Sequence, residues 1–382
     1  MIYREYGRGN EKISEIGYGG EHIEGLPENE VIPVIERVIE SGINIIDIFM
    51  SNPEVRTYIG NALGSKRKDV FIQGHLGATW QNNQYERSRN LDDVKTAFED
   101  LLTRLNTDYI DFGLLHFIDS DEDYNGVFDN GNFTYAQELQ KLGVIKRIGF
   151  SSHNPIISQK LIDTGYFDMY MFSINPGFDM DPISKSDIDT LFTFNGAKSS
   201  TAAIDPVRQA LYNSSEAKGI GITVMKTLGA GHLLDAESSP FGESMSVGQC
   251  IKYALDRPAV VSVLLGCKTV EEVDEVMAYY SLSEEQKDYS NVISNALANT
   301  YGKCMYCNHC LPCPASIDIA AVNKYYDLAL TQDTVPATVK GHYLSLSSHA
   351  SDCISCGSCL SNCPFSVDVI TRMQQAEKLF GV

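Results

Sequence analysis

The stretch Cys353-Ile-Ser-Cys356-Gly-Ser-Cys359-Leu-Ser-Asn-Cys363-Pro364 decides how the C-terminal part of the chain folds. An earlier run, Cys304-Met-Tyr-Cys307-Asn-His-Cys310-Leu-Pro-Cys313-Pro314, has the same spacing except for one residue fewer before its last cysteine. Thiolates at every third residue let one turn of backbone reach three corners of an iron–sulfur cube, so a fourth ligand must come from elsewhere. Together the two runs predict a small, mainly helical domain that folds around two iron–sulfur clusters.

The two runs are expected to exchange one ligand each. The longer run has the C-x-x-C-x-x-C-x-x-x-C-P spacing of bacterial two-cluster ferredoxins, in which the cysteine before proline ligates the other cluster. We therefore expect one [4Fe–4S] cluster on Cys304, Cys307, Cys310 and Cys363, and a second on Cys353, Cys356, Cys359 and Cys313. Zinc sites and disulfides are the alternatives. Zinc typically uses cysteine pairs separated by a longer loop, and disulfides are rare in a chain that lacks a secretory signal.

Length and charge narrow the class of protein. The chain has 382 residues, enough for one large and one small domain. Its formal net charge is −20, which repels nucleic acid and anionic membranes. No apolar run is long enough for a membrane helix, and only Cys250 and Cys267 lie outside the cysteine runs. We expect a cytoplasmic protein without nucleic-acid or membrane partners, in an anaerobic host that would protect exposed clusters from oxygen.

Before residue 290, short β-rich runs alternate with amphipathic helical patterns. The expected strands lie near 16–20, 44–49, 69–74, 109–115, 146–151, 168–174, 220–226 and 260–266. The expected helices lie at 28–41, 53–63, 90–105, 135–143, 154–164, 203–218, 245–256 and 269–280. Eight repeats predict a (β/α)₈ TIM barrel over 1–290, with a hairpin at about 2–16 and the ferredoxin-like domain over 291–382. A doubly wound open sheet is the alternative. Long loops are expected at 117–134 and 175–202.

Polar residues follow several of these strands, at the ends that a barrel brings to one mouth. Asp47 closes the second strand and Lys226 closes the seventh. Five of the eight histidines also follow predicted strands: His22, His75, His116, His153 and His232. Histidines at one rim could transfer protons near neutral pH or hold a metal ion.

These positions resemble those of the aldo/keto reductases, in the subgroup with a C-terminal ferredoxin-like domain. The resemblance rests on Asn44-Ile-Ile-Asp47, Asp108-Tyr-Ile-Asp-Phe-Gly-Leu-Leu-His116, Ile148-Gly-Phe-Ser151-Ser-His153 and Gly221-Ile-Thr-Val-Met-Lys226-Thr-Leu-Gly-Ala-Gly231. The run from Cys304 to Pro314 is similar to the subgroup's Cys-x-x-Cys-x-Tyr-Cys-x-Pro-Cys-Pro signature, with His309 in place of tyrosine. The resemblance implies that a nicotinamide gives hydride to a carbonyl carbon, while a tyrosine, a lysine, an aspartate and a histidine manage the proton.

Two of these four catalytic places match. By the resemblance, Asp47 takes the aspartate place and His116 the histidine place. The tyrosine place holds Asn52, and the lysine place at the end of the third strand holds His75. The nearest tyrosine, Tyr58, is expected on the next helix. We therefore expect Asp47, His75 and His116 to form the catalytic group, with the two histidines sharing proton transfer.

The resemblance also implies places for a nicotinamide. Ser151 and Asn175 take the carboxamide place, and Glu275 lies near the adenine, although Val276 replaces the asparagine that usually follows. The residues expected near the phosphates are Lys226, Gly229, Gly231 and Lys268, the last of which precedes a helix N-terminus. Binding of NADP(H) is left open.

Three functions remain. The first is an iron–sulfur oxidoreductase of aldo/keto reductase type that reduces a small carbonyl compound with a nicotinamide. The second is a reductase in which the clusters deliver single electrons to a substrate in the barrel mouth, supplied by an external carrier such as ferredoxin or flavodoxin. The third is a non-catalytic electron-transfer or redox-sensing protein on a degenerate barrel.

Overall fold

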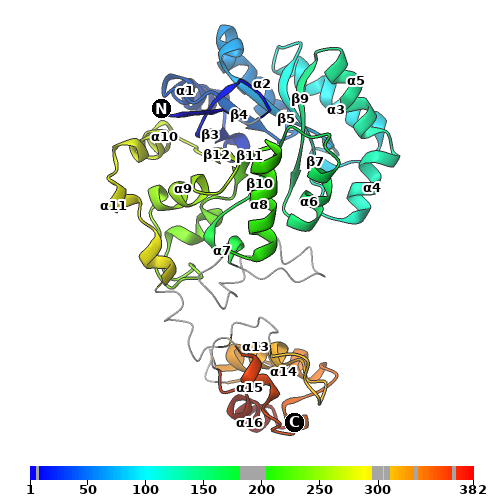
Figure 1. Ribbon diagram of the computed structural model, residues 1–382, viewed down its shortest axis with the longest axis vertical. Helices are drawn as coiled ribbons and strands as arrows, with labels where there is room; N and C mark the ends of the chain where they lie inside the picture. Colours follow the sequence, from blue (N-terminus) through cyan, green and yellow to red (C-terminus); the bar gives the residue numbers. More distant parts are fainter. Residues whose placement is uncertain (6–7, 181–203, 295–303, 305–309, 331–333, 364–366) are drawn as a thin grey trace.

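The structure is a computed structural model, and it describes the chain except for residues 6–7, 181–203, 295–303, 305–309, 331–333 and 364–366. Eight parallel strands close into a barrel (Figure 1). Their order around the barrel is β3 (Ile16–Gly19), β4 (Ile45–Ile48), β5 (Phe71–Leu76), β8 (Ile110–Leu115), β9 (Ile145–Ser152), β10 (Met169–Ser173), β11 (Gly221–Met225) and β12 (Val260–Leu265). The predicted TIM barrel is confirmed, and the open-sheet alternative is wrong.

An outer layer of helices covers the strands. It consists of α1 (Glu28–Glu40), α2 (Pro53–Leu63), α3 (Leu91–Arg104), α4 (Asp121–Asp129), α5 (Asn132–Lys141), α6 (Pro155–Asp163), α7 (Pro176–Asp179), α8 (Pro206–Lys218), α9 (Val247–Leu255), α10 (Val270–Met277) and α11 (Glu284–Lys287), with short 3₁₀ turns η1 (Gly20–Ile23), η2 (Gly64–Asp69), η4 (Gly229–Leu234) and η5 (Ala278–Ser281). The side chains of Asn90, Asn154 and Thr269 accept hydrogen bonds from the first backbone N–H groups of α3, α6 and α10. These caps fix where the helices begin, as the sequence predicts.

The interior of the barrel is filled by apolar side chains. One cluster contains Ile45, Phe112, Leu114, Met169 and Leu264, and Ile13 of the N-terminal hairpin joins it. That hairpin pairs β1 (Tyr3–Glu5) with β2 (Lys12–Ser14) in antiparallel fashion. The predicted hairpin is therefore present, and its fully buried Ile13 helps to fill the barrel interior.

Two segments differ from the expected loops. The acidic stretch expected as a loop at 117–134 contains helix α4, because Ser120 caps its start and accepts from Asp123 N–H. A hairpin of β6 (Ala78–Gln81) and β7 (Gln84–Arg87) follows β5, and its turn residues Asn82 and Asn83 both have positive φ. Positive φ at both central residues is typical of the type I′ turn. The loop expected at 175–202 begins with α7, and its remainder from 181 lies outside the described residues.

The C-terminal part has its own apolar core. It contains α13 (Ile319–Leu330), α14 (Ala337–Leu344), η6 (Ala350–Asp352), α15 (Ser358–Asn362) and α16 (Val369–Phe380). Tyr343 and Phe380 stack at a centroid distance of 3.9 Å within this core. The core of the barrel extends to Val292 and Ile293, so a domain boundary at 290 stays a prediction.

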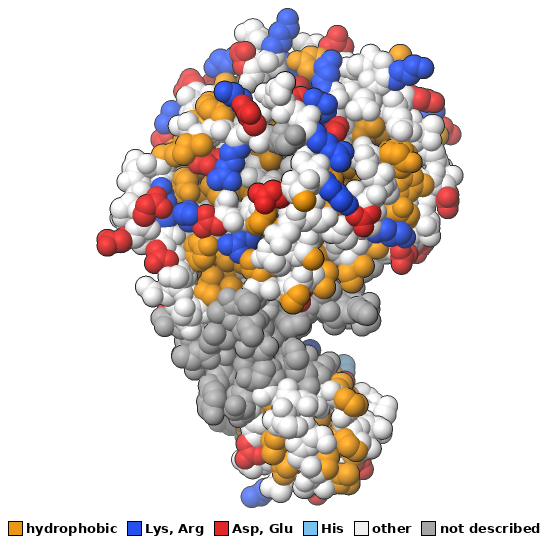
Figure 2. Space-filling model, viewed as in Figure 1, with side chains coloured by type: hydrophobic (Ala, Val, Ile, Leu, Met, Phe, Trp, Pro, Cys, Tyr) orange, Lys and Arg blue, Asp and Glu red, His pale blue; other side chains and the backbone are white. Residues whose placement is uncertain are grey.

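Both parts carry charged and apolar side chains on their surfaces. Figure 2 shows charged and hydrophobic side chains side by side on the visible barrel face, and hydrophobic side chains also on the C-terminal helices. Among the described residues, Ile354, Leu330 and Leu344 of the C-terminal part are large apolar side chains left exposed. No helix in the described ranges is both long enough and apolar enough to cross a membrane.

Candidate active site

A chain of hydrogen bonds occupies the mouth of the barrel. Asp47 ends β4, His75 lies near the end of β5, and His116 directly follows β8. His75 Nε2 lies 2.9 Å from Asp47 Oδ1, and His75 Nδ1 lies 2.9 Å from His116 Nδ1. The three side chains that the sequence singles out as catalytic therefore form one connected group.

The inner end of this chain is held by polar contacts inside the barrel. Gln73 Nε2 donates to the same Asp47 Oδ1 at 2.5 Å, and Gln73 Oε1 accepts from the Thr223 hydroxyl at 3.0 Å. Thr223 lies on β11, across the barrel from β4 and β5. Asp47 is thus a buried carboxylate with two donors on one oxygen, which orients it toward His75.

The outer end of the chain is a tyrosine that the sequence analysis does not single out. The Tyr85 hydroxyl lies 2.6 Å from His116 Nε2, and it comes from the β6–β7 hairpin. Of the four side chains, Asp47 is 1% exposed, His75 3% and His116 5%, whereas Tyr85 is 37% exposed. Tyr85 is therefore the member of the chain that meets solvent or a bound molecule.

Burial and charge perturb the pKa values of the two outer members of this chain, His116 and Tyr85. Burial, the neighbouring His75 and then Arg89 lower the pKa of His116 well below its usual 6.5. Burial raises the pKa of Tyr85 to about 12, against the opposing effect of Arg87 and Arg89. At neutral pH the chain therefore contains a neutral His116 and a protonated Tyr85.

A second aspartate–histidine pair lies beside the first. Asp119 Oδ2 is 2.9 Å from His153 Nδ1, and Asp119 Oδ1 accepts from the Ser152 hydroxyl and from His153 N–H. Burial alone would raise the pKa of Asp119, but these hydrogen bonds outweigh it and lower the pKa. Phe117 lies between the pairs, with its ring centroid 6.0 Å from that of His116 and 5.2 Å from that of His153.

The remaining rim histidines do not join this group. His22 is exposed and packs against Gly266, and His232 is exposed within η4. Within the described ranges, no three His, Cys, Asp or Glu side chains are grouped so that they could hold a single metal ion.

Ser151 and Asn175, expected to hold a carboxamide, support the backbone instead. Ser151 Oγ accepts from Phe117 N–H at 2.8 Å, and Phe117 has a φ of +54°. Asn175 is fully buried and donates to the carbonyl of Lys226, whose φ is +59°, at 2.7 Å. Asn175 also accepts from Phe178 N–H. Positive φ in residues other than glycine costs free energy, so both polar side chains stabilise a strained turn of the mouth.

The expected nucleotide contacts are also scattered. Gly229 and Gly231 lie in η4, both with positive φ, and Lys268 is exposed before α10. The first turn of α10 already holds Glu271 and Glu272, which places negative charge where a phosphate would bind.

The adenine end of the expected site fits no better. Glu275 is exposed, whereas Val276 beside it is buried in the barrel core. Asn175 holds backbone groups and acidic residues occupy the helix N-terminus, and the nicotinamide contacts named from the sequence stay predictions.

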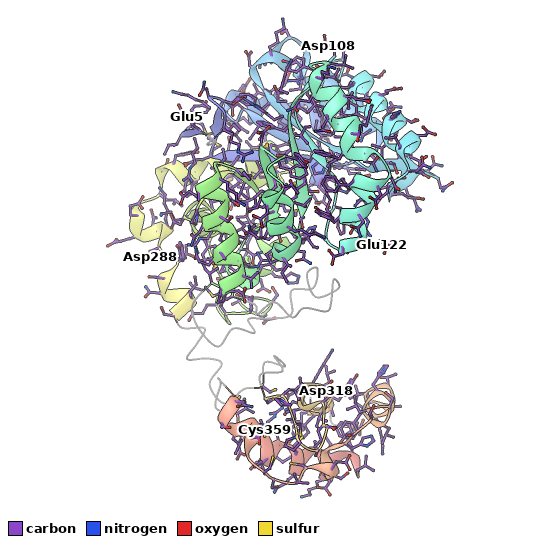
Figure 3. The ribbon with its side chains drawn as sticks, turned by 45° about the vertical axis from the view of Figure 1, so that its right-hand side comes forward. Glu5, Asp108, Glu122, Asp288, Asp318 and Cys359 are labelled. Atoms are coloured by element: carbon purple, nitrogen blue, oxygen red, sulfur yellow. The ribbon has the colours of Figure 1, made fainter. Side chains whose placement is uncertain are left out.

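The cysteines of the second expected cluster line one cavity. Cys313 from the first run shares this cavity with Cys353, Cys356 and Cys359 from the second. Apolar side chains surround it: Ile317, Ile319, Ile354, Val369, Ile370 and Met373. Figure 3 shows Cys359 on the helical C-terminal part. Four thiols in an apolar cavity fit a [4Fe–4S] cluster, in which each iron takes one thiolate and the ligands stand farther apart than around a single ion.

The other expected cluster is described in part. Cys310 is buried in the C-terminal core, and Cys304 and Cys363 pack against that core. Cys307 lies outside the described residues. Cys313 lies in one cavity with the three cysteines of the second run, as an exchange of the cysteine before proline requires, and the ligand roles of Cys313 and Cys363 stay predictions.

The fold is a closed barrel with a polar mouth, joined to a cysteine-rich helical part. Residues 15–182 match the aldo/keto reductase family, and residues 278–368 match the 4Fe-4S dicluster domain. The chain therefore carries an aldo/keto reductase domain followed by a 4Fe–4S dicluster domain, as the sequence predicts.

The relatives resemble the barrel part. "Uncharacterized oxidoreductase YqkF" of Bacillus subtilis is 25% identical over 289 residues, which cover 72% of this chain and 90% of that protein. "Aldo-keto reductase YhdN" of the same organism is 23% identical, over 74% of this chain and 89% of that protein. These relatives support an oxidoreductase.

Solved structures share the fold at low identity. The holo form of aldo-keto reductase AKR11C1 from Bacillus halodurans has a TM-score of 0.59 at 19% identity, over 78% of this chain and 96% of that chain. An aldo/keto reductase from Klebsiella pneumoniae in complex with NADP and acetate has a TM-score of 0.54 at 17% identity, over 77% and 95%.

Proposed function

We propose that this protein reduces a small carbonyl compound in the barrel mouth, with protons moved by Asp47, His75 and His116. The observation that carries the proposal is their continuous hydrogen-bonded chain, which connects a buried carboxylate to the mouth. Two imidazoles in series can pass a proton along the chain, and general acid catalysis needs a proton within hydrogen-bonding reach of the reacting oxygen.

We further propose that the electrons come from an iron–sulfur domain rather than from a bound nicotinamide. Cys313, Cys353, Cys356 and Cys359 would hold one [4Fe–4S] cluster, and Cys304, Cys307, Cys310 and Cys363 the other. When bound, such clusters supply electrons one at a time. A one-electron protein such as ferredoxin or flavodoxin would be the external donor.

The residue in the lysine place agrees with this proposal. His75 stands in the lysine place, and its Nε2 contacts Asp47. The two backbone hydrogen bonds of Asn175 use one N–H and one lone pair of its amide, which leaves half of its hydrogen-bonding capacity for a carboxamide. The NADP in the Klebsiella pneumoniae structure is a property of that protein. A reducing, anaerobic cytoplasm stays a prediction.

The test is anaerobic turnover of the full chain loaded with iron and sulfide. We would offer 4-nitrobenzaldehyde as a carbonyl probe with reduced methyl viologen, NADPH or NADH as the donor. We expect reduction with the viologen and none with either nucleotide, and calorimetry should show no nucleotide binding. Turnover with NADPH would mean that the protein reduces its substrate by hydride transfer from a nicotinamide. No reduction of a broad carbonyl panel by any donor would favour a redox-sensing module.

A further inference from the structure

We infer that Tyr85, on the β6–β7 hairpin, is the residue that exchanges a proton with the oxygen of the substrate. In this view the hydrogen-bonded chain Tyr85–His116–His75–Asp47 is a proton wire, and a single proton on the wire decides whether Tyr85 accepts or donates. The inference rests on the proposed function, because it supplies the atom that would touch the carbonyl. It assigns the acid to a hairpin, away from the strand-end loop where Asn52 stands.

The partners fix which atom donates at each step of the wire. An ionised Asp47 only accepts, so His75 donates from Nε2 and, when neutral, keeps its lone pair on Nδ1. His116 must then donate from Nδ1 to His75 Nδ1, across 2.9 Å, which leaves the lone pair of His116 on Nε2. That lone pair accepts the Tyr85 hydroxyl hydrogen at 2.6 Å. In this state Tyr85 offers the substrate lone pairs only, and it acts as an acceptor.

One added proton reverses the outermost bond. When His116 becomes an imidazolium, both of its nitrogens carry hydrogen, so Nε2 donates to the Tyr85 oxygen. The Tyr85 hydroxyl hydrogen is then free to point outward and to donate to a carbonyl oxygen. The protonated wire is the form that drives reduction, and the neutral wire is the form suited to oxidation of an alcohol.

Reduction of the carbonyl takes two electrons, which the clusters would deliver one at a time, and two protons, one on carbon and one on oxygen. The wire supplies the proton on oxygen, and the proton on carbon comes from solvent. When the carbonyl has taken up electrons, the substrate oxygen carries negative charge. The O–H bond of Tyr85 breaks as the O–H bond of the substrate forms, and the Tyr85 oxygen takes the proton from His116 Nε2. The histidine pair returns to its neutral state, and no protein residue changes its oxidation state. The next proton enters from solvent at Tyr85, the exposed end.

The hairpin holds Tyr85 in a defined place. Its two-residue turn matches the twist of the strands it joins, which favours a single register. The buried Ser51 hydroxyl donates to the Thr79 carbonyl at 2.6 Å, which ties the hairpin to the segment after β4. The Phe49 ring lies edge-on to Tyr85, with centroids 5.9 Å apart, and parallel to His116 at 6.0 Å. Both partners in the outermost bond therefore pack against one ring.

Charged and titratable groups from several elements face the wire. Asp47 and His75 belong to the wire itself, on β4 and β5. The others come from η1, from β7 and the segment after it, and from the end of β9: Glu21, Arg87, Arg89 and His153. The cationic groups among them disfavour a positive charge on His116. The protonated wire therefore becomes common only as the pH falls. The same cations stabilise negative charge on a substrate oxygen beside Tyr85.

A spectroscopic test locates the hydrogens on the two histidines of the wire without a substrate. In the full chain, loaded with oxidised clusters and ¹⁵N-labelled at histidine, we expect His75 to carry its hydrogen on Nε2 and His116 on Nδ1. Tyr85→Phe should move the ¹⁵Nε2 resonance of His116 toward the position of an unbonded imine nitrogen. The control is Tyr58→Phe on α2, which packs against the barrel core and should leave that resonance unchanged.

A kinetic test reads the role of the hydroxyl. With 4-nitrobenzaldehyde and reduced methyl viologen, Tyr85→Phe should lower kcat roughly a hundredfold or more, which is typical for loss of a positioned proton donor. Tyr58→Phe should keep wild-type kcat. The pH dependence should show the rate of reduction rising as the pH falls, and this rise should be lost with Tyr85→Phe.

Two results would overturn the inference. An unchanged ¹⁵Nε2 resonance of His116 in Tyr85→Phe, or a hydrogen found on Nδ1 of His75, would mean that the wire does not have this direction. Wild-type kcat and pH dependence in Tyr85→Phe would mean that Tyr85 does not exchange the proton. If the wild type reduces no carbonyl probe, the proposed function fails, while the histidine resonances still decide whether the wire exists.

Discussion

The barrel mouth contains two aspartate–histidine pairs with the same separation and different surroundings. In each pair a carboxylate oxygen lies 2.9 Å from an imidazole nitrogen: Asp47 with His75, and Asp119 with His153. All four side chains are buried. Distance and burial alone therefore do not distinguish the pair that belongs to a catalytic chain.

The difference lies in what else each carboxylate holds. Asp119 accepts from the side chain and backbone of residues 152–154, so it fixes the turn that follows β9. Asp47 instead accepts from Gln73 and His75, and His75 passes the connection on to His116. Asp119 joins the segment after β8 to the turn after β9, whereas the Asp47–His75 connection extends across three strands to an exposed tyrosine. A carboxylate–histidine pair is a candidate for proton transfer when the other ring nitrogen of the histidine is hydrogen-bonded toward the solvent-exposed end of a chain.

The largest expected effect comes from replacing a histidine, either His116, which is bonded to the Asp47–His75 pair, or His153 of the other pair. His116→Gln should lower kcat for carbonyl reduction roughly a hundredfold or more, because the wire then loses a group that can hold a proton. His153→Gln, the matched change in the other pair, should lower kcat less than about tenfold. Steady-state kinetics with a fixed carbonyl probe compares the two. Equal losses would remove the distinction between the pairs.

The second prediction concerns stability, for which we expect the change at Asp119 to be more damaging than the change at Asp47. Asp119→Asn should lower the free energy of unfolding by about 2–3 kcal/mol, because several buried donors lose a charged acceptor. Asp47→Asn should cost about 1 kcal/mol, since an amide oxygen in the same place can still accept from Gln73 and His75. Urea unfolding of the two variants measures this difference. A more damaging Asp47→Asn would show that Asp47 is chiefly structural.

A third effect depends on pH. The pKa values of His116 and His153 lie below 6.5 in the folded protein, so below about pH 6.5 the unfolded chain binds more protons at both positions. Stability from these histidines is complete above that pH and is lost as the pH falls, by at most about 1.4 kcal/mol per histidine and pH unit. His116→Gln and His153→Gln should each flatten the slope of unfolding free energy between pH 6.5 and 5. A slope unchanged in either variant would contradict this assignment.

Much of the fold follows from sequence because its signals are local. Alternating strand and helix patterns give the eight strands, and cap residues such as Asn90 and Asn154 mark helix starts. The sequence also predicts that Asp47, His75 and His116 lie together, because they lie at the ends of parallel strands and such strands end at one mouth. The loop expected at 117–134 is wrong where Ser120 caps α4, a local signal that was available.

The rest of the site depends on contacts that spacing does not encode. Tyr85 reaches His116 because a hairpin folds over the mouth, and only Asn82-Asn83 between the two hairpin strands hints at that turn. Ser151 and Asn175 have the residue types suited to a carboxamide, but strained backbone at Phe117 and Lys226 uses their hydrogen bonds. Only the folded mouth shows which polar atoms already have a hydrogen-bond partner.

The smallest expected effect tests whether packing keeps the wire aligned. Phe49 stacks nearly parallel to the His116 ring, with an interplanar angle of 7°, and meets Tyr85 edge-on. Aromatic pairs of this kind contribute about 0.5–1.5 kcal/mol, so Phe49→Leu should lower kcat about threefold by loosening the Tyr85–His116 bond. The matched control is Phe128→Leu, which removes a tilted contact to Phe133 on the outer helices and should leave kcat unchanged. If both changes lower kcat equally, general loosening of the barrel explains the loss. If Phe49→Leu alone lowers it, alignment of the outward-leading pair is a separate requirement that the Asp119–His153 pair does not share.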